Sequence, residues 1–233
     1  MRRTLGVTLA TILVLGVAGE VAAQTDQPYL RLPHRAHIFV DGGIAIPATP
    51  SVFKDFWNPT LPLSIGAGGV VFSWLDINGV FTYVKFNNNF VKTKQSIDYV
   101  GIGEVEGGSF TSIMFAATAR FLAVPDSRAN PYLEFGVGSF TNSFENLIIR
   151  DPNNEDQTPI IENTAEDVSG IMVSIAGGLQ YALNEHWSSY VKYSFTTNIN
   201  EDFKPGVLVG EPDTVPGGNQ RYSSLSIGLM IRL

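Results

Sequence analysis

Charged residues recur at alternating positions in otherwise apolar or small-residue segments of this 233-residue chain. A period of 2 indicates β-strands, so charges in phase with small and polar residues are expected on one face of a sheet. Arg120 and Glu134 lie nearly symmetrically about Ser127 in a short predicted hairpin, and we expect them to be cross-strand neighbours. Inward-facing charges of both signs are expected to form ion pairs in the confined space inside the sheet. They would act either as a structural plug, which is the interpretation that we favour, or as a gate for small ions. The set comprises Asp41, Lys85, Arg120, Glu134 and Lys192, with Arg232 as a further candidate.

Acidic residues gather in the long connections between these segments. Residues 47–62, 92–108, 143–168 and 198–220 hold 15 Asp and Glu against 5 Lys and Arg. Contacts with divalent cations or with a cationic partner are one interpretation, and solvated loops that repel one another are the other. The run D-P-N-N-E-D from Asp151 to Asp156 suggests calcium only loosely, because it lacks the spacing of a known calcium loop. The formal net charge of −7 argues against nucleic acid as a partner.

The last stretch, Arg221 to Leu233, alternates with period 2 to the end of the sequence. One face is apolar and the other is small or polar. A long one-sided apolar strand with a free edge promotes aggregation, and closing the sheet into a barrel removes that edge. We therefore predict a closing strand whose apolar face contacts lipid. The apolar face carries Leu225, Ile227, Leu229, Ile231 and Leu233.

Seven further segments show strand character, and the connections alternate between long and short. Short periplasmic turns and long external loops are typical of outer-membrane barrels. The sequence therefore predicts an all-β fold, an eight-stranded antiparallel up-and-down transmembrane β-barrel, with D-I-N-G (76–79) in the connection of its second hairpin. The predicted strands are Ala36 to Ile46, Leu63 to Trp74, Val80 to Val91, Ser109 to Ala123, Tyr132 to Asn142, Ser169 to Tyr181, Trp187 to Thr197 and Arg221 to Leu233.

Four aromatic residues flank the predicted short turns: Trp74, Tyr132, Tyr181 and Trp187. Tryptophan and tyrosine are enriched where a membrane meets water. We predict that these residues form the periplasmic aromatic girdle of the barrel.

The N-terminal region is typical of an exported protein. Arg2 and Arg3 precede a short apolar run, and V-A-A precedes Gln24, so residues 1–23 are predicted to be a secretory signal peptide. Residues 24–35 form a polar periplasmic segment leading into the barrel domain, residues 36–233. Because the chain has no cysteine, thiolate metal sites and disulfides are excluded.

The chain resembles the OmpA-like eight-stranded outer-membrane β-barrel family in P-Y-L-E-F-G-V-G-S-F (131–140), G-G-L-Q-Y-A-L-N-E-H-W (177–187) and the terminal strand. The resemblance covers residues 36–233. It implies that the five apolar residues of the terminal strand are an assembly signal read by the barrel-insertion machinery, and that outer-membrane lipid and lipopolysaccharide surround the barrel. Leu233 stands where the family usually ends in an aromatic residue. The resemblance is to the barrel domain alone, without the peptidoglycan-binding domain, so it implies no wall-tethering role.

The sequence offers little for catalysis, and we predict no enzyme, no catalytic residue, no cofactor and no metal. His186-Trp187-Ser188 has the His-x-Ser spacing seen in lipid A deacylase barrels, but it lies at a short periplasmic turn with no evident acid to orient the imidazole. The glycine-rich stretches 66–69 and 101–108 lack the Lys-Ser/Thr ending of a phosphate loop. The predicted function is a structural or surface-interaction role through the long acidic loops. The alternatives are a narrow channel for ions or small solutes and a lipid-modifying barrel enzyme.

Overall fold

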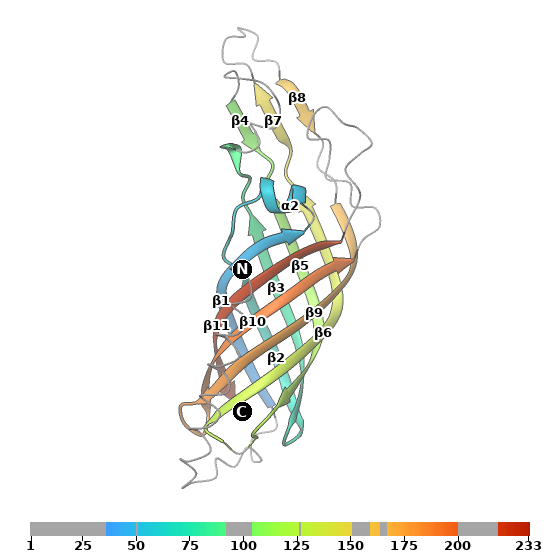
Figure 1. Cartoon of the computed structure of the whole chain (residues 1–233). Coiled ribbons are helices and arrows are strands. Elements are labelled where there is room, and N and C mark those ends of the chain that lie inside the picture. The colour runs from blue at the N-terminus through green and yellow to red at the C-terminus, as the bar shows by residue number, and fades with distance from the viewer. Residues whose placement is uncertain are drawn as a thin grey trace, which may run out of the picture.

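A closed, eight-stranded antiparallel β-barrel forms the body of the computed structural model (Figure 1), which confirms the predicted fold. The structure describes residues 36–49, 51–91, 104–125, 127–150, 159–163, 167–199 and 219–233. Each barrel strand pairs with its neighbours along the chain, and the first strand closes on the last. The barrel strands are β1 (Ala36–Thr49), β2 (Leu63–Phe72), β3 (Leu75–Phe86), β5 (Phe110–Leu122), β6 (Ala129–Phe144), β9 (Asp167–Ala182), β10 (Trp187–Ile199) and β11 (Gln220–Arg232).

Strand β11 closes the barrel between β1 and β10. Its large apolar side chains at Leu225, Ile227 and Leu229 are exposed on the outside, whereas Ser224 and Ser226 are buried inside. This is the inverse of a soluble sheet, since the apolar face contacts lipid and the small polar face fills a narrow interior. The role of the five apolar residues as an assembly signal remains a prediction.

The second hairpin differs from its predicted form. Strands β2 and β3 turn at Ser73 and Trp74, and D-I-N-G lies inside β3. Asp76 and Asn78 are buried in the interior, where Asn78 Oδ1 lies 2.7 Å from His37 Nε2. Aspartate and asparagine usually mark turns, but the interior of a membrane barrel is polar and accepts them within a strand.

The facing of β3 is also the reverse of the prediction, which placed Lys85 inside. Val84 and Phe86 are fully buried in the interior, so Lys85 lies on the outer face at the end of the strand. Its Nζ pairs with Glu145, just beyond the end of β6, and both side chains are more than one-third exposed. The hydrogen bond from Lys85 is the main reason that the pKa of Glu145 lies below its ordinary value. Lys85 is therefore a rim residue and does not belong to the charges inside the barrel.

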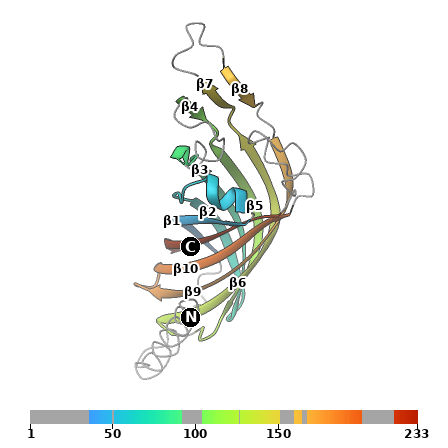
Figure 2. The same ribbon diagram turned by 45° about the horizontal axis from the view of Figure 1, so that its top comes forward.

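Two predicted loop regions contain regular structure. The segment 47–62 includes a short helix, α2 (Ser51–Phe56), which sits over one mouth of the barrel (Figure 2). Beyond the same mouth lies a three-stranded sheet in the order β4 (Glu104–Gly107), β7 (Leu147–Arg150) and β8 (Pro159–Asn163) (Figure 1). Gly107 and Gly108 have positive φ angles of 74° and 71°, which glycine adopts without a steric penalty, so the chain can turn from β4 into β5.

Among the described residues, no helix has the length and apolar character needed to cross a membrane.

Candidate functional site in the barrel interior

Arg120 and Glu134 form an ion pair in the half of the barrel nearer the short turns. They face each other in the β5–β6 register, as their positions about the turn predicted. Arg120 Nε donates a hydrogen bond of 2.7 Å to Glu134 Oε2, and Arg120 Nη2 lies 2.7 Å from the same oxygen. Arg120 is fully buried and Glu134 is 6% exposed. A charge pair so far from water is held by mutual attraction, and losing one partner leaves the other without a counter-charge.

Three aromatic rings surround the guanidinium of Arg120. Its Cζ lies 4.5 Å from the ring centroid of Tyr132, 5.2 Å from that of Tyr190 and 5.7 Å from that of Phe39. A cation within about 6 Å of an aromatic ring face is attracted by the ring's quadrupole, and more strongly when both are desolvated. We call Arg120 and these three rings the arginine cage.

Each ring of the arginine cage rests on a glycine of the adjacent strand. Phe39 pairs with Gly66, Tyr132 with Gly178, and Tyr190 with Gly228. A Cβ atom built on any of these glycines would come within 2.2–2.5 Å of the ring, so no other residue fits without a displacement. The glycines let the rings lie flat against the wall, which leaves the centre of the narrow barrel to the charges.

A second ion pair lies above the arginine cage. Lys192 Nζ is 2.9 Å from Asp41 Oδ2, and Tyr190 Oη donates a hydrogen bond of 2.8 Å to the same oxygen. Asp41 and Lys192 are both buried. Tyr190 thus connects the two pairs, because its ring contacts Arg120 and its hydroxyl contacts Asp41.

A small polar cavity of about 60 Å³ lies above these pairs. Asp41, Glu134 and Lys192 line it together with hydroxyl groups, including those of Ser64, Thr82, Ser194 and Thr196. A single water needs roughly 10–15 Å³ of such volume, so the cavity has room for a few waters. Ion-pair oxygens and hydroxyl groups would give these waters several hydrogen-bond partners.

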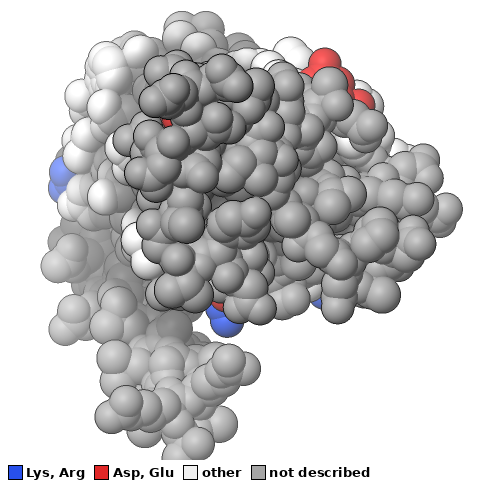
Figure 3. Space-filling view, turned by 90° about the horizontal axis from the view of Figure 1, so that it is seen from above, with Lys and Arg blue, Asp and Glu red and all other residues white. Residues whose placement is uncertain are grey.

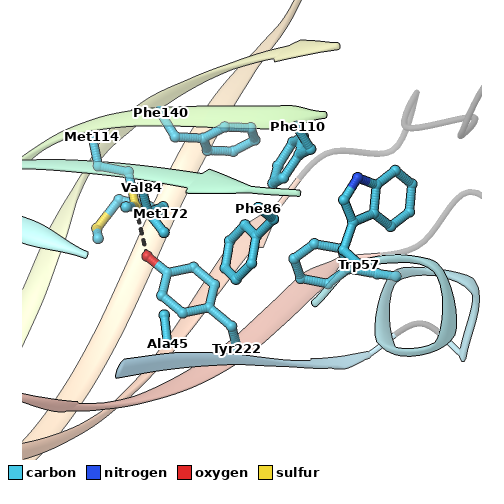
Figure 4. Close-up of a cluster of buried hydrophobic side chains, with 10 residues drawn as sticks. Ala45, Trp57, Val84, Phe86, Phe110, Met114, Phe140, Met172 and Tyr222 are labelled. Atoms are coloured by element: carbon cyan, nitrogen blue, oxygen red, sulfur yellow. Dashed lines mark hydrogen bonds between the residues drawn. The ribbon is translucent and has the colours of Figure 1, made fainter. Parts of the chain in front are cut away.

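A cluster of buried, largely aromatic side chains, which we call the aromatic plug, closes the mouth above the cavity (Figure 4). Its members are Ala45, Phe53, Trp57, Val84, Phe86, Phe110, Met114, Phe140, Met172 and Tyr222. Phe53 of α2 is 1% exposed and packs edge-on against Phe86 and Phe110, with ring centroids 5.2 and 5.4 Å apart. Trp57 follows the helix, and its Nε1 donates a hydrogen bond of 3.0 Å to the Gly108 carbonyl. Below them, Tyr222 Oη lies 3.0 Å from Met114 Sδ. The interior is therefore filled by aromatic side chains at one end and by ion pairs toward the other.

The structure brings together four of the five predicted interior charges, Asp41, Arg120, Glu134 and Lys192. Arg232 lies at the end of β11, and its backbone N–H donates to the His186 carbonyl. The aromatic plug and the glycines under the rings were not predicted from the sequence. The plug could not be recognised from the sequence because Phe53 and Trp57 fall in the proline-rich segment 47–62, which was predicted to be a loop.

The four predicted girdle residues fall into two groups. Trp74, Tyr181 and Trp187 are exposed on the outer face near the short turns, and Trp74 stacks between Phe72 and Phe121. Tyr132 is only 3% exposed and lies inside, against Arg120, so its assignment to the girdle was wrong. Tyr132 lies two positions before Glu134 on β6, so the two side chains share the inner face. The alternation of side chains along a strand therefore predicts the facing of Tyr132 better than its closeness to a turn does.

His186 and Ser188 are not arranged as a catalytic pair. His186 is exposed on the turn between β9 and β10, whereas Ser188 is buried in the interior. Among the described residues, no three His, Asp or Glu side chains are grouped so that they could hold a metal ion. The run Asp151 to Asp156 lies outside the described residues. In the view from above, the most prominent described acidic side chains lie at one edge of the molecule, with smaller acidic and basic spots elsewhere on the face (Figure 3).

Comparison with known proteins agrees with this architecture. No protein-family model matches the sequence, and no curated protein sequence matches it. Among solved structures, Neisserial surface protein A (NspA) is 15% identical with a TM-score of 0.52, covering 85% of this chain and 97% of that one. A major outer membrane protein from Thermus thermophilus is 10% identical with a TM-score of 0.52, covering 86% of this chain and 100% of that one.

The chain therefore has the fold of the small outer-membrane β-barrels. Within that class, the chain has the architecture of the OmpA-like barrels, with eight strands and a packed interior.

Proposed function

We propose that this protein resides in the outer membrane as a non-conducting barrel and acts at the cell surface through its acidic external loops. The observation that carries the proposal is the double closure of the interior. The aromatic plug fills the external mouth, and the arginine cage fills the half nearer the periplasm. The cavity between them measures about 60 Å³, which supports a closed barrel over a channel.

The external side of the barrel supports the second part of the proposal. Strands β4, β7 and β8 extend beyond the mouth as a separate sheet, and α2 fixes the base of the first long loop. The four long loops carry 15 acids and 5 bases, a net charge of −10. Loops so charged attract cationic surfaces, and the attraction weakens with added salt. We therefore propose a cationic partner or bridging divalent ions, with lipopolysaccharide as the surrounding lipid.

We expect the wild-type barrel to give no discrete conductance steps in a planar bilayer. The arginine cage and the aromatic plug fill the interior on either side of the small cavity, so we expect no hydrated path for an ion. Insertion is verified on the same sample by the boiling-dependent shift in gel mobility that closed barrels show. Regular single-channel steps from such a sample would favour the channel alternative and contradict the proposal.

Neutralising three of the seven acids in the longest loop, residues 143–168, should weaken adhesion to a cationic surface. We expect Asp151→Asn/Glu155→Gln/Asp156→Asn to retain less barrel than wild type on immobilised poly-lysine at low salt, with the difference vanishing at high salt. Glu185→Gln, in the short turn after β9, is the control and should bind as wild type does. Equal retention of the triple variant and wild type would overturn the role of the loop.

A further inference from the structure

The outer wall of the barrel carries an apolar groove on strands β1, β2, β3 and β5. Its floor is a row of small outward residues in register, Ala67 opposite Gly79 and Gly79 opposite Ala117. The groove has a volume of about 590 Å³, within the range of roughly 300–1,000 Å³ that small-molecule sites occupy. Ile38 bounds it on the β1 side.

Bulky residues close the groove toward the external side. Ile65 pairs with Phe81, and Phe81 with Phe115, one row above the floor. The rings of Phe81 and Phe115 lie 4.9 Å apart and form a continuous wall. One row below the floor, Ile77 lies between the small residues Gly69 and Ala119, so the low surface continues toward the short turns only on either side of the Ile77 side chain.

On the other side of the barrel the outer wall carries mainly large side chains, and an outward glycine such as Gly177 stands singly among them. Strands β9, β10 and β11 place Ile175, Phe195, Tyr193, Ile227 and Leu229 on the lipid side, all at least 46% exposed. The groove is therefore a local feature, produced by Ala67, Gly79 and Ala117.

We propose that this groove is a binding site for one acyl chain of a phospholipid from the periplasmic leaflet. The site lies within the apolar band and has a mainly apolar lining, so hydrocarbon fills it in a membrane. The wall formed by Phe81 and Phe115 separates it from the outer leaflet, where lipopolysaccharide resides. A second barrel fits less well, since a stable protein interface buries about 800 Å² per partner and needs more than a channel one row wide.

The proposal rests on the proposed membrane location but not on the loops or on the closed interior. Its test therefore uses reconstituted barrels, so its outcome is independent of conductance and of binding to poly-lysine. Barrels in phospholipid nanodiscs are irradiated with phospholipids that carry a diazirine either at the end of the acyl chain or close to the headgroup. Mass spectrometry then locates the adducts.

We expect adducts from the chain-end probe to concentrate at Ala67, Gly79 and Ala117, and adducts from the headgroup-proximal probe to lie nearer the short turns. Gly79→Leu should abolish this concentration by filling the groove. A Cβ atom at Gly79 meets no atom closer than 4.0 Å, so the variant is expected to fold, which its gel shift checks. Gly177→Leu is the matched control, because Gly177 is an outward glycine on β9 whose added Cβ makes only ordinary contacts at 3.6 and 3.9 Å.

Three results would overturn the proposal. Adducts spread evenly around the barrel, or unchanged by Gly79→Leu, would show that the groove selects no chain. Headgroup-proximal adducts on the external side of Phe81 would assign the chain to the other leaflet. Loss of the lipid adducts in a sample whose barrels run as a dimer, with Gly79→Leu restoring the monomer, would identify a second copy as the occupant.

Discussion

Arg120→Ala is expected to lower the free energy of unfolding of the barrel by about 3–5 kcal/mol, because it leaves Glu134 buried without a counter-charge. Glu134 Oε2 receives both contacts from the guanidinium, and Glu134 is only 6% exposed. The variant also removes the cation that the three rings face. Urea titration of barrels in detergent, followed by gel mobility, measures the change. A midpoint equal to that of wild type would mean that the interior is wet, since an exposed pair is worth less than about 1 kcal/mol.

A double variant separates the unpaired charge from the loss of volume. Arg120→Met/Glu134→Leu removes both charges and keeps much of the side-chain bulk. Replacing a buried ion pair by apolar residues of similar size is often neutral or stabilising, so we expect the double variant to be more stable than Arg120→Ala. If the double variant were as unstable as Arg120→Ala, the instability of Arg120→Ala would come from the loss of the cation inside the cage and not from the unpaired charge of Glu134.

Strand period is a strong signal in this chain, and it accounts for what the sequence predicted correctly. In β5 and β6 one face is clearly apolar and the other is small or polar, so the pairing of Arg120 with Glu134 followed from their positions about one short turn. In β3 both faces carry apolar residues because its inner face contributes Val84 and Phe86 to the aromatic plug. The predicted facing of β3 therefore relied on its single Lys, Lys85, which was assumed to point inward. Because Lys85 lies outside at the rim, the predicted facing was the reverse of the observed one.

The remaining errors arise from contacts that no local pattern encodes. D-I-N-G has the composition of a turn, but His37 and Thr118 from other strands satisfy Asn78 within β3. Helix α2 has only 6 residues, and its position depends on Phe53 packing against rings from β3 and β5. Such elements are stable because of tertiary packing, which outweighs local propensity.

The glycines under the rings connect the fold to its interior. A glycine in a strand weakens it by about 0.5–1 kcal/mol relative to alanine, so its presence in a wall needs a compensating contact. At Gly66, Gly178 and Gly228 the compensation is an aromatic ring lying over the backbone of the neighbouring strand. Aromatic side chains covering cross-strand glycines also stabilise strand register, and here the same three rings position Arg120.

Gly228→Val is therefore expected to destabilise the barrel by about 1–3 kcal/mol through overpacking. A Cβ atom at this position would lie 2.3 Å from Tyr190 Cζ. The ring cannot move freely, because its hydroxyl is bonded to Asp41 and its face contacts Arg120. The same urea titration measures the loss.

The matched control is Gly177→Val, which adds the same side chain to an outward glycine where the new Cβ makes only ordinary contacts. The control should unfold near the wild-type midpoint, since its added surface faces lipid or detergent. Combining Gly228→Val with Tyr190→Ala should partly relieve the clash, so the two losses should not add. Additive losses of stability, or equal losses at Gly228 and Gly177, would contradict this prediction. Either result would show that the position of the Tyr190 ring does not require the glycine beneath it, and that other contacts hold the arginine cage in place.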